Sequence, residues 1–240
     1  MTRRRVHLPP DRIGATRAEL TEEARHYLRD VLRLSPGAAV ELFDGKGAAW
    51  EAVIEPGFAA LAVGSRREAL PAGLALSLLF ALAKGEKNDL VVQKATELGV
   101  ARLCPWAAER SVVRLDGEKG RERAERWRRI AEEAARQCGR SDVPEVVVPG
   151  TLAQALQAPD GFERIAFHAG AGAPLGDSVR PGAAGFLALL GPEGGLTDRE
   201  VRACLDAGFR LASLGPRVLR AETAAVAVAA LIQHLAGDLG

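Results

Sequence analysis

The sequence is poor in the residues that build disulfide frameworks and structural metal sites. Its three cysteines, Cys104, Cys138 and Cys204, lie far apart, and no Cys-x-x-Cys pair occurs. This pattern excludes a disulfide scaffold and a zinc knuckle. We therefore expect reduced thiols, no metal and a cytoplasmic location.

Long hydrophobic runs are also absent. The longest purely apolar stretch, residues 224–232, is far shorter than the roughly 20 residues that a membrane-spanning helix needs. The basic start MTRRRVHLPP has no apolar segment behind it, so it does not resemble a signal peptide. These features predict a protein with no membrane partner.

Neither sign of charge is in excess, because 32 Lys+Arg stand against 31 Asp+Glu and the net charge is +1. The charge of the whole chain therefore does not indicate a nucleic-acid partner. Basic residues do gather locally. The first 35 residues carry eight arginines against five acids, and residues 102–140 carry eleven Lys+Arg against seven acids. Either cluster fits a solvated face or a contact with RNA phosphates.

The 240 residues are 48% hydrophobic and 26% charged, which is ordinary globular composition and excludes wholesale disorder, a collagen-like repeat and a coiled coil. Residues 1–71 predict a small β-barrel with one helix that Thr21 caps. The strands are expected at residues 3–8, 38–43, 48–54 and 58–65. Two turns, DGKG at 44–47 and EPG at 55–57, separate the last three of these.

From residue 72 onward the pattern changes to alternating strands and helices, which predicts an α/β domain with a mainly parallel sheet. The expected strands cover residues 74–83, 101–107, 146–148, 164–168, 185–190 and 209–214. The expected helices cover 88–98, with Asn88 or Asp89 as cap, and 121–138, 152–157, 197–207 and 221–235. The last helix is apolar on nearly every face, so we expect it to be buried on all sides.

Two Gly-Pro turns, each directly after an expected strand, are the most informative feature. GPEGGLT (191–197) leads into a helix with Thr197 and Glu200 at capping-box positions, and GPRVLRAET (215–223) leads into the last helix. Ligands bind beyond the carboxyl ends of strands in open α/β sheets, and glycines allow close backbone approach. The pair predicts loops that clasp a flat heterocycle. A plain strand–helix connection, and an internal Arg220–Glu222 salt bridge, are the alternatives.

Other segments imitate known binding loops. GAGAPLG (170–176) lacks the spacing of a dinucleotide fingerprint, Pro174 interrupts it, and no amphipathic helix is expected there. This argues against a Rossmann-type dehydrogenase. KGEK (84–87) lacks the remaining elements of a Walker A loop. We interpret His168 as an ordinary residue at the end of a strand rather than as a catalytic residue.

Four motifs in order carry a resemblance: KGEKNDLVVQKATELGV (84–100), ERSVVRLDGEKGRERAERWRRIAEEAARQCGR (109–140), LLGPEGGLTDREV (189–201) and LGPRVLRAETAAVAVAAL (214–231). They closely resemble the RsmE family, bacterial 16S rRNA uracil-N3 methyltransferases of the SPOUT superfamily. The start, RRRVHLPP with HYLRDVLRLSPGAAVELFDGKG, resembles that family's PUA-like RNA-binding barrel.

The resemblance implies a PUA-like β-barrel over residues 1–71 and a SPOUT methyltransferase domain with a C-terminal trefoil knot over 72–240, a rare exception to unknotted topology. It implies S-adenosyl-L-methionine as cofactor, a homodimer, and 16S rRNA, within the 30S subunit, as partner. The cofactor-binding residues that it implies are Leu190, Gly191, Pro192, Glu193, Gly194, Gly195, Leu196, Leu214, Gly215, Val218, Leu219, Thr223 and Ala224.

The implied reaction must remove the uracil N3 proton, so it needs a base or a group that stabilises the uracil anion. Arg220 is the first candidate for stabilising carbonyl charge, and Glu222 for holding Arg220 or handling the proton, with Glu193 as an alternative. The expected RNA-binding residues are Arg3, Arg4, Arg5, Arg29, Arg33 and Arg110. A knotted methyltransferase acting on ribose 2′-hydroxyl or tRNA, and a non-catalytic RNA-binding assembly factor, stay open.

Overall fold

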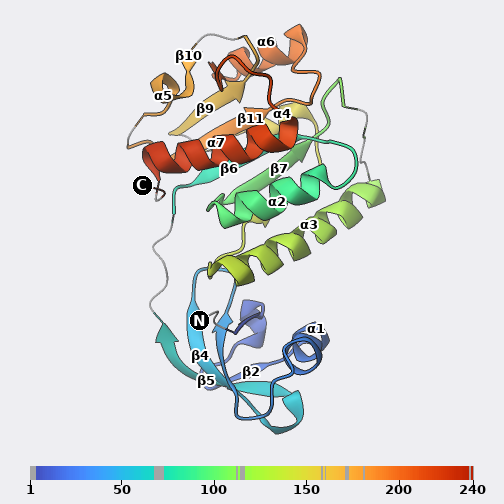
Figure 1. Cartoon of the computed structure of the whole chain (residues 1–240), viewed down its shortest axis with the longest axis vertical. Helices are drawn as coiled ribbons and strands as arrows, with labels where there is room; N and C mark the ends of the chain where they lie inside the picture. The colour runs from blue at the N-terminus through green and yellow to red at the C-terminus, as the bar shows by residue number, and fades with distance from the viewer. Residues whose placement is uncertain are drawn as a thin grey trace. The chain divides into compact units, whose positions relative to one another are not determined.

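The computed structural model describes residues 4–67, 73–111, 113, 117–157, 159, 161–170, 173–180, 182–237 and 239. Contacts divide the chain, coloured by residue number in Figure 1, into two units. Unit 1 contains Met1–Ala72 and Glu132–Val143, and unit 2 contains Gly73–Ala131 and Pro144–Gly240. The sequence predicts a single boundary after residue 71, and nothing in it indicates that a second stretch belongs to unit 1.

Unit 1 is built on a mixed five-stranded sheet in the order β1-β3-β4-β5-β2. β1 and β3 pair in parallel, and the other neighbours are antiparallel. Because β1 and β2 form the two edges, the sheet is a half-barrel rather than a closed barrel. The strands are β1 (Arg5–His7), β2 (Arg17–Glu19), β3 (Ala39–Phe43), β4 (Ala49–Ile54) and β5 (Ala60–Arg67). The sequence analysis did not predict β2.

The helix of unit 1 begins where predicted, because Thr21 Oγ1 accepts a hydrogen bond from the backbone N–H of Ala24 at 3.1 Å. Ala24 and Leu28 are buried in the core of the half-barrel. Val31, which would share their face in a regular α-helix, is 58% exposed. The helix widens into a π-helical turn there, which takes Val31 out of the 3.6-residue spacing. The helical segments are η1 (Pro10–Arg12), α1 (Glu22–His26), the π-turn η2 (Tyr27–Val31) and η3 (Pro56–Phe58).

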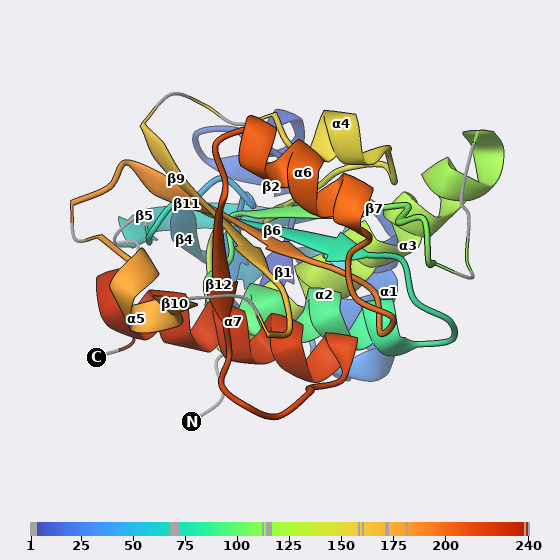
Figure 2. The same ribbon diagram turned by 90° about the horizontal axis from the view of Figure 1, so that it is seen from above.

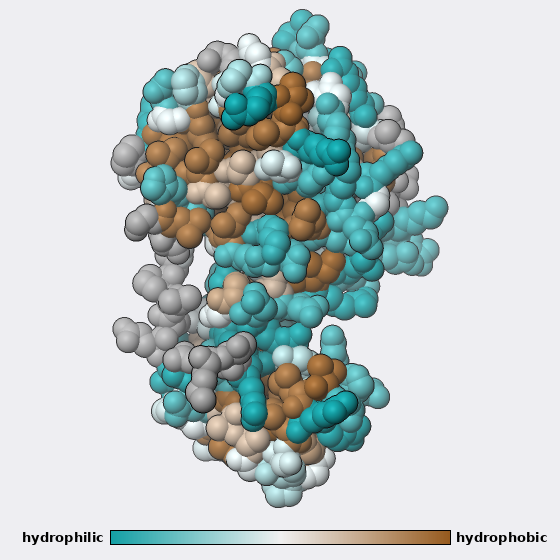
Figure 3. Space-filling view, in the orientation of Figure 1, coloured by the Kyte–Doolittle hydropathy of each residue, from teal (hydrophilic) through white to brown (hydrophobic). Residues whose placement is uncertain are grey.

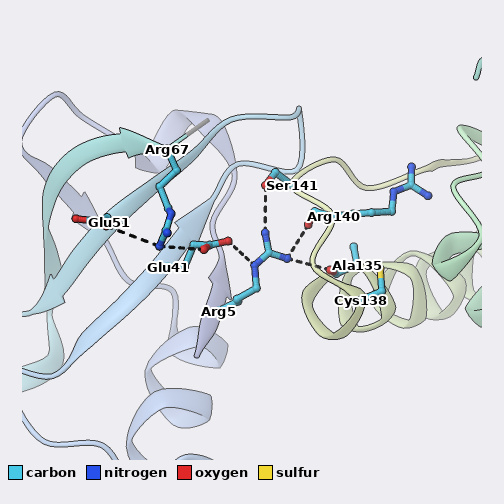
Figure 4. A network of polar contacts seen from close by, with 8 residues as sticks. All are labelled: Arg5, Glu41, Glu51, Arg67, Ala135, Cys138, Arg140 and Ser141. Atoms are coloured by element: carbon cyan, nitrogen blue, oxygen red, sulfur yellow. Dashed lines mark hydrogen bonds and ion pairs between the residues drawn. The ribbon is translucent and has the colours of Figure 1, made fainter. Parts of the chain in front are cut away.

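Arg5 joins the two stretches of chain that make up unit 1 (Figure 4). Its Nε donates to Glu41 Oε1 at 2.6 Å, and its Nη1 donates to the carbonyl oxygens of Ala135, at 3.0 Å, and Arg140, at 2.8 Å. Its Nη2 donates to Ser141 Oγ at 3.1 Å. Arg5 is 4% exposed, so these bonds take the place of water. The buried guanidinium therefore holds residues 135–141 against β1 and β3.

Unit 2 is built on a seven-stranded sheet in the order β10-β12-β9-β11-β6-β7-β8, and every pairing in it is parallel. β6 and β11, at its centre, are buried at every position because their sequences are apolar except for Ser77 of β6. The strands are β6 (Leu76–Ala81), β7 (Arg102–Trp106), β8 (Glu145–Val146), β9 (Phe162–Phe167), β10 (Ala173–Pro174), β11 (Gly185–Leu190) and β12 (Arg210–Ser213). The predicted α/β fold with a mainly parallel sheet is confirmed.

Helices cover both faces of this sheet. Figure 2 shows α2 and α7 on one face and α4 and α6 on the other. The helices are α2 (Lys87–Glu97), α3 (Gly117–Cys138), α4 (Leu152–Ala155), α5 (Leu175–Ser178), α6 (Asp198–Asp206) and α7 (Ala221–Ala236). α5 is a single turn that begins at the end of GAGAPLG (170–176), where no amphipathic helix is expected, and continues to Ser178. In the described part of the chain, no helix is both long and apolar enough to cross a membrane.

The start of α2 differs from the prediction, because neither Asn88 nor Asp89 caps it. The helix begins at Lys87, and buried Asn88 instead uses Oδ1 to accept from the backbone N–H of Ala83 at 2.8 Å, which fixes the loop after β6. Asp89 accepts from Trp127 Nε1 at 2.8 Å and from Arg126 Nη2 at 2.7 Å. Both side chains are used for tertiary contacts, which outweigh local capping.

α7 is only partly buried, contrary to expectation. Ala225, Val228, Ala229 and Ile232 face the sheet and α2. Leu231 and Leu235 are each 42% exposed, as is Leu90 on the neighbouring α2. Figure 3 shows hydrophobic residues gathered over this part of unit 2. The apolar residues of α7 therefore cover both an inner face and an outer one.

Candidate functional site

The loops that follow β9, β11 and β12 meet at one edge of the sheet. These three strands are neighbours and parallel, so their carboxyl ends lie side by side. The loops and the start of α7 enclose a cavity of about 320 Å³. Its lining consists of Phe167, His168, Ala169, Leu190, Gly191, Pro192, Glu193, Gly194, Gly195, Ala212, Leu214, Gly215, Arg217, Val218, Leu219, Ala221 and Ala224.

Most residues that the resemblance implies for the cofactor lie in this lining, and two do not. Leu196 is buried under Gly191, and Thr223 is exposed on α7 outside the cavity. Phe167, His168 and Ala169 also line the cavity, although none of them is among the binding residues predicted from the sequence. The Nδ1 of His168 is buried and has no hydrogen-bond partner within the described residues. The pairing of β9 with β11 and β12 places it here, and no local pattern of the sequence contains that pairing.

Two glycines set the shape of the loop that follows β11, residues 191–197, which we call the first loop. A Cβ on Gly191 would lie 2.9 Å from Leu196 Cδ2 and 3.2 Å from the Leu196 backbone nitrogen, so with a larger residue here Leu196 or the loop would have to shift. Gly195 has φ +70°, and its N–H donates to the carbonyl oxygen of Pro192 at 2.8 Å, which closes a tight turn. The backbone therefore forms the wall of the cavity at this loop.

Contacts from behind hold the first loop in place. Glu200 is buried, and its Oε2 accepts from the backbone N–H of Thr197 while its Oε1 accepts from that of Glu109, both at 2.8 Å. The first of these bonds confirms the predicted capping box. Arg110 donates from Nη1 to the carbonyl oxygen of Gly194 at 2.6 Å. Arg110 was expected to bind RNA, and the structure places its guanidinium on the cavity loop.

Four charged residues gather where the first loop, α2 and α7 approach one another. Lys87 forms a hydrogen-bonded ion pair with Glu193, and its Nζ lies 3.9 Å from Glu222 Oε2. The hydrogen bond raises the pKa of Lys87 and lowers that of Glu193, while the positive charge of Arg220 opposes the rise at Lys87. Arg220 is exposed at the start of α7. The Arg220–Glu222 salt bridge considered from sequence is therefore replaced by a Lys87–Glu222 pair.

Glu222 lies beside the cavity rather than in its lining. Its side chain is 15% exposed, and Oε2 is buried without a hydrogen-bond partner among the described residues. Glu222 and Lys87 line a small hollow of about 10 Å³ that shares Leu190, Gly191 and Ala221 with the cavity. A carboxylate at the first turn of α7 is favoured by the helix dipole.

The basic residues expected to contact RNA differ in exposure. Arg4, Arg29 and Arg33 are exposed, although Arg29 is paired with Asp30 and lowers the pKa of that carboxyl to about 2. Arg3 lies outside the described residues. Arg5 is buried, and its guanidinium is fully engaged in contacts within unit 1, so it is not available to bind RNA.

Unit 1 also has a hollow of about 790 Å³ over β3, β4 and β5. Arg4 and Arg67 line it together with apolar side chains and two carboxylates. Arg67 lies 3.4 Å from Glu41 and 3.8 Å from Glu51, as Figure 4 shows. One positive group on this surface is thus partly neutralised, while Arg4 is exposed.

Among the described residues, no group of three or more His, Cys, Asp or Glu side chains is arranged so that it could hold a metal ion. Burial raises the pKa of the Cys104 and Cys204 thiols to about 11, which keeps them protonated.

Comparison with protein-family models finds two matches. Residues 71–233 match an RNA methyltransferase domain, and residues 20–57 match an RNA methyltransferase PUA domain. The order of the two matches is the one that the resemblance implies. The first match alone spans more than half of the chain.

Individual relatives agree with these models. Ribosomal RNA small subunit methyltransferase E from Bacillus subtilis (strain 168) is 32% identical over 218 residues, which is 85% of each chain. The protein of that name from Synechocystis sp. is 35% identical and aligns over 96% of this chain and 77% of its own. The Neisseria gonorrhoeae protein of that name, crystallised with S-adenosyl methionine, has a TM-score of 0.90 at 32% identity, covering 99% of this chain and 100% of its own.

A methyltransferase from Legionella pneumophila, also crystallised with S-adenosyl methionine, has a TM-score of 0.88 at 34% identity and covers 98% of both chains. These likenesses extend over both units and over every loop of the cavity. The chain therefore belongs to the family of ribosomal RNA small subunit methyltransferase E.

Proposed function

We propose that this chain transfers a methyl group from S-adenosylmethionine to N3 of one uridine in the 16S rRNA of the small ribosomal subunit, in the bacterial cytoplasm. The observation that carries the proposal is the cavity at the carboxyl ends of β9, β11 and β12. The similarity to small-subunit rRNA methyltransferases, one of them crystallised with S-adenosyl methionine, supports the methyl donor and the class of RNA.

The residues of the cavity fit such a donor. The volume of about 320 Å³ lies at the lower end of the usual range for small-molecule sites. Glycine at positions 191, 194 and 195 leaves this loop without bulky side chains, so that a flat adenine ring can approach its backbone closely. The buried, unpartnered Nδ1 of His168 supplies a polar contact in a largely apolar wall. S-adenosylmethionine supplies an electrophilic methyl group on a sulfonium, which the N3 lone pair takes up while the sulfur leaves as a neutral thioether.

The side chains beside the cavity suit the proton that must leave N3. Uracil N3 is protonated at neutral pH, so its lone pair becomes available only when that proton passes to a base. We assign the proton to the Glu222 carboxylate, whose Oε2 has no hydrogen-bond partner among the described residues. Exposed Arg220, two residues earlier, is assigned to the negative charge that develops on the uracil carbonyl oxygens.

RNA binding is assigned to the basic surface of unit 1. Arg4, Arg29 and Arg33 are exposed there, and we include Arg3 from its place in the sequence. Phosphate contacts of this kind position a substrate without reading its bases. The target uridine must leave its stack to enter a cavity built of backbone loops, as bases do in other enzymes that modify them.

A homodimer is part of the same proposal. Leu90, Leu231 and Leu235 form an exposed apolar strip on α2 and α7, and Val218, in the loop before α7, is 80% exposed. Contiguous apolar surface of this kind marks a protein interface more often than free solvent surface. A second copy of the chain, packed through α7, would cover it.

The test is methylation of 30S subunits purified from a strain that lacks the corresponding activity, followed by nucleoside analysis. We expect 3-methyluridine in 16S rRNA at one position, and naked 16S rRNA serves as the second substrate. A 2′-O-methylated or tRNA product would instead support a different knotted methyltransferase. Calorimetric binding of S-adenosylmethionine without any product would support an assembly factor. If Arg220→Ala methylates at the full single-turnover rate, Arg220 does not stabilise the charge on the uracil carbonyl oxygens.

A further inference from the structure

Among the described residues, Lys87 is the cation that contacts both carboxylates beside the cavity. It forms an ion pair with Glu193 of the first loop, and its Nζ lies 3.9 Å from Glu222 Oε2 at the start of α7. Glu193 and Glu222 are 29 positions apart: Glu193 lies in the loop after β11, which lines the cavity, and Glu222 lies in the first turn of α7, beside the cavity. A single ammonium group thus joins the two halves of the site.

The position of Lys87 in α2 argues against a purely local role. Lys87 is the first residue of α2, where the positive end of the helix dipole disfavours a cation. The same helix has Lys94 in its last turn, paired with Glu97 at 2.9 Å, which is the end where the dipole favours a positive charge. Helix stability therefore accounts for Lys94 but not for Lys87. The carboxylates from outside the helix account for Lys87.

The surroundings of Lys87 also connect it to the cavity. With Glu222 it lines the small hollow that shares Leu190, Gly191 and Ala221 with the cavity wall. Its side chain is 36% exposed, so the ammonium group is accessible from solvent as well. The hydrogen bond to Glu193 raises the pKa of Lys87, so it remains a cation throughout the neutral range.

We propose that Lys87 is a positioning residue for methyl transfer, which holds Glu193 and Glu222 on one cation and so fixes the first loop relative to the proton acceptor. This inference rests on the proposed function for its kinetic consequence only. If Lys87 is replaced by a neutral residue, two carboxylates share the site without a cation between them, and they repel each other. The Glu222 carboxylate then moves from the place where it accepts the N3 proton, and the loop that carries Glu193 is no longer anchored.

The variants that test this are Lys87→Met and Lys87→Arg, with Lys94→Met as the matched control in the same helix. We expect Lys87→Met to lower the single-turnover rate at saturating donor and 30S subunits by at least about tenfold, because misplaced groups slow the chemical step. Lys87→Arg should recover most of that rate, since it keeps the charge. Lys94→Met should retain the full rate, and thermal unfolding verifies that all three variants are folded.

A second readout does not depend on turnover. Calorimetry with S-adenosylhomocysteine should show about two- to fivefold weaker binding for Lys87→Met and for Glu193→Gln. The double variant should bind no more weakly than either single variant, because both remove the same ion pair. Additive losses of affinity, or a Lys87→Arg variant as impaired as Lys87→Met, would overturn the proposal. If the unaltered chain yields no 3-methyluridine, the proposed function fails, and this binding cycle still decides the role of Lys87.

Discussion

Arg110 donates a hydrogen bond from Nη1 to the carbonyl oxygen of Gly194 at 2.6 Å and so supports the first cavity loop from the loop after β7. A Cβ on Gly194 would lie 3.3 Å from Arg110 Cδ, so the aliphatic part of the arginine also packs on this glycine. The sequence alone suggests a phosphate ligand at position 110. In the structure the guanidinium of Arg110 contacts the backbone of the cavity loop.

Replacing Arg110 by alanine should therefore weaken cofactor binding rather than RNA binding. The hydrogen bond to Gly194 is charge-assisted but exposed, so we expect about fivefold lower affinity for S-adenosylhomocysteine in calorimetry. Arg110→Lys, which keeps the charge but not the geometry of the guanidinium, should recover only part of it. If Arg110→Ala leaves cofactor affinity unchanged and makes the salt dependence of RNA binding shallower, Arg110 binds RNA and the prediction is wrong.

Arg5 should matter for stability and Arg4 should not. Arg5→Leu leaves the buried Glu41 without its 2.6 Å partner and frees residues 135–141, which should cost about 3 kcal/mol or more. Exposed Arg4→Ala should change stability by no more than about 0.5 kcal/mol. Hydrogen exchange of the β1 and β3 amides measures the difference. Equal protection in both variants would contradict a structural role for Arg5.

The exposed arginines of unit 1 should set the salt dependence of RNA binding. Replacing Arg3, Arg4, Arg29 and Arg33 by glutamine should lower the slope of log affinity against log salt by about 0.7 to 0.9 for each phosphate that the variant no longer neutralises. Binding of S-adenosylhomocysteine, measured on the same preparation, should not change. A slope equal to that of the unaltered chain would show that this surface does not contact RNA.

Gly191 should be the most sensitive position of the first loop. In Gly191→Ala the added Cβ would meet the side chain and the backbone nitrogen of Leu196, so Leu196 or the loop must shift, and we expect cofactor affinity to fall by about tenfold. Gly176→Ala is the matched control, because a Cβ there would meet nothing within 4 Å. Calorimetry measures both. Tight binding by Gly191→Ala would mean that the backbone of this loop does not form the wall of the donor site.

The three cysteines should differ in reactivity. Cys138 is exposed, whereas Cys104 and Cys204 are buried with pKa values raised to about 11. Since the thiolate is the nucleophile, maleimide should label Cys138 first in the folded protein. Mass spectrometry of the labelled peptides detects this, and Cys138→Ser should abolish the fast phase. Early labelling of Cys104 would show that its strand opens to solvent.

The sequence predicts the frame of unit 2 well, because strong local patterns and tertiary structure agree there. β11 is a continuous apolar run, and the Thr197–Glu200 capping box is a local arrangement that needs no distant partner. Asn88 shows the opposite case. Its side chain suits a helix cap, but the backbone N–H of Ala83 is the group that it bonds, and only the folded loop brings that group close.

The parts of the site that were missed depend on non-local pairing. His168 enters the cavity because β9 lies between β11 and β12, an order that no local pattern contains. Lys87 meets Glu193 across more than a hundred positions of sequence. Arg5 was interpreted as an RNA ligand because a run of three arginines suggests a surface. Three of its four acceptors belong to residues 135–141, a segment that gives no sequence signal of its own.

The contacts of Arg5 with residues 135–141 limit how the N-terminal domain of this chain can be replaced by recombination. The half-barrel consists of an N-terminal piece and a short piece near residue 140, so its folding information is not contiguous along the gene. A fragment ending near residue 72 would retain Arg5 without three of its acceptors. Recombination that replaces the N-terminal part of this chain would also have to replace residues 132–143. Otherwise the buried arginine and its acceptors would no longer match.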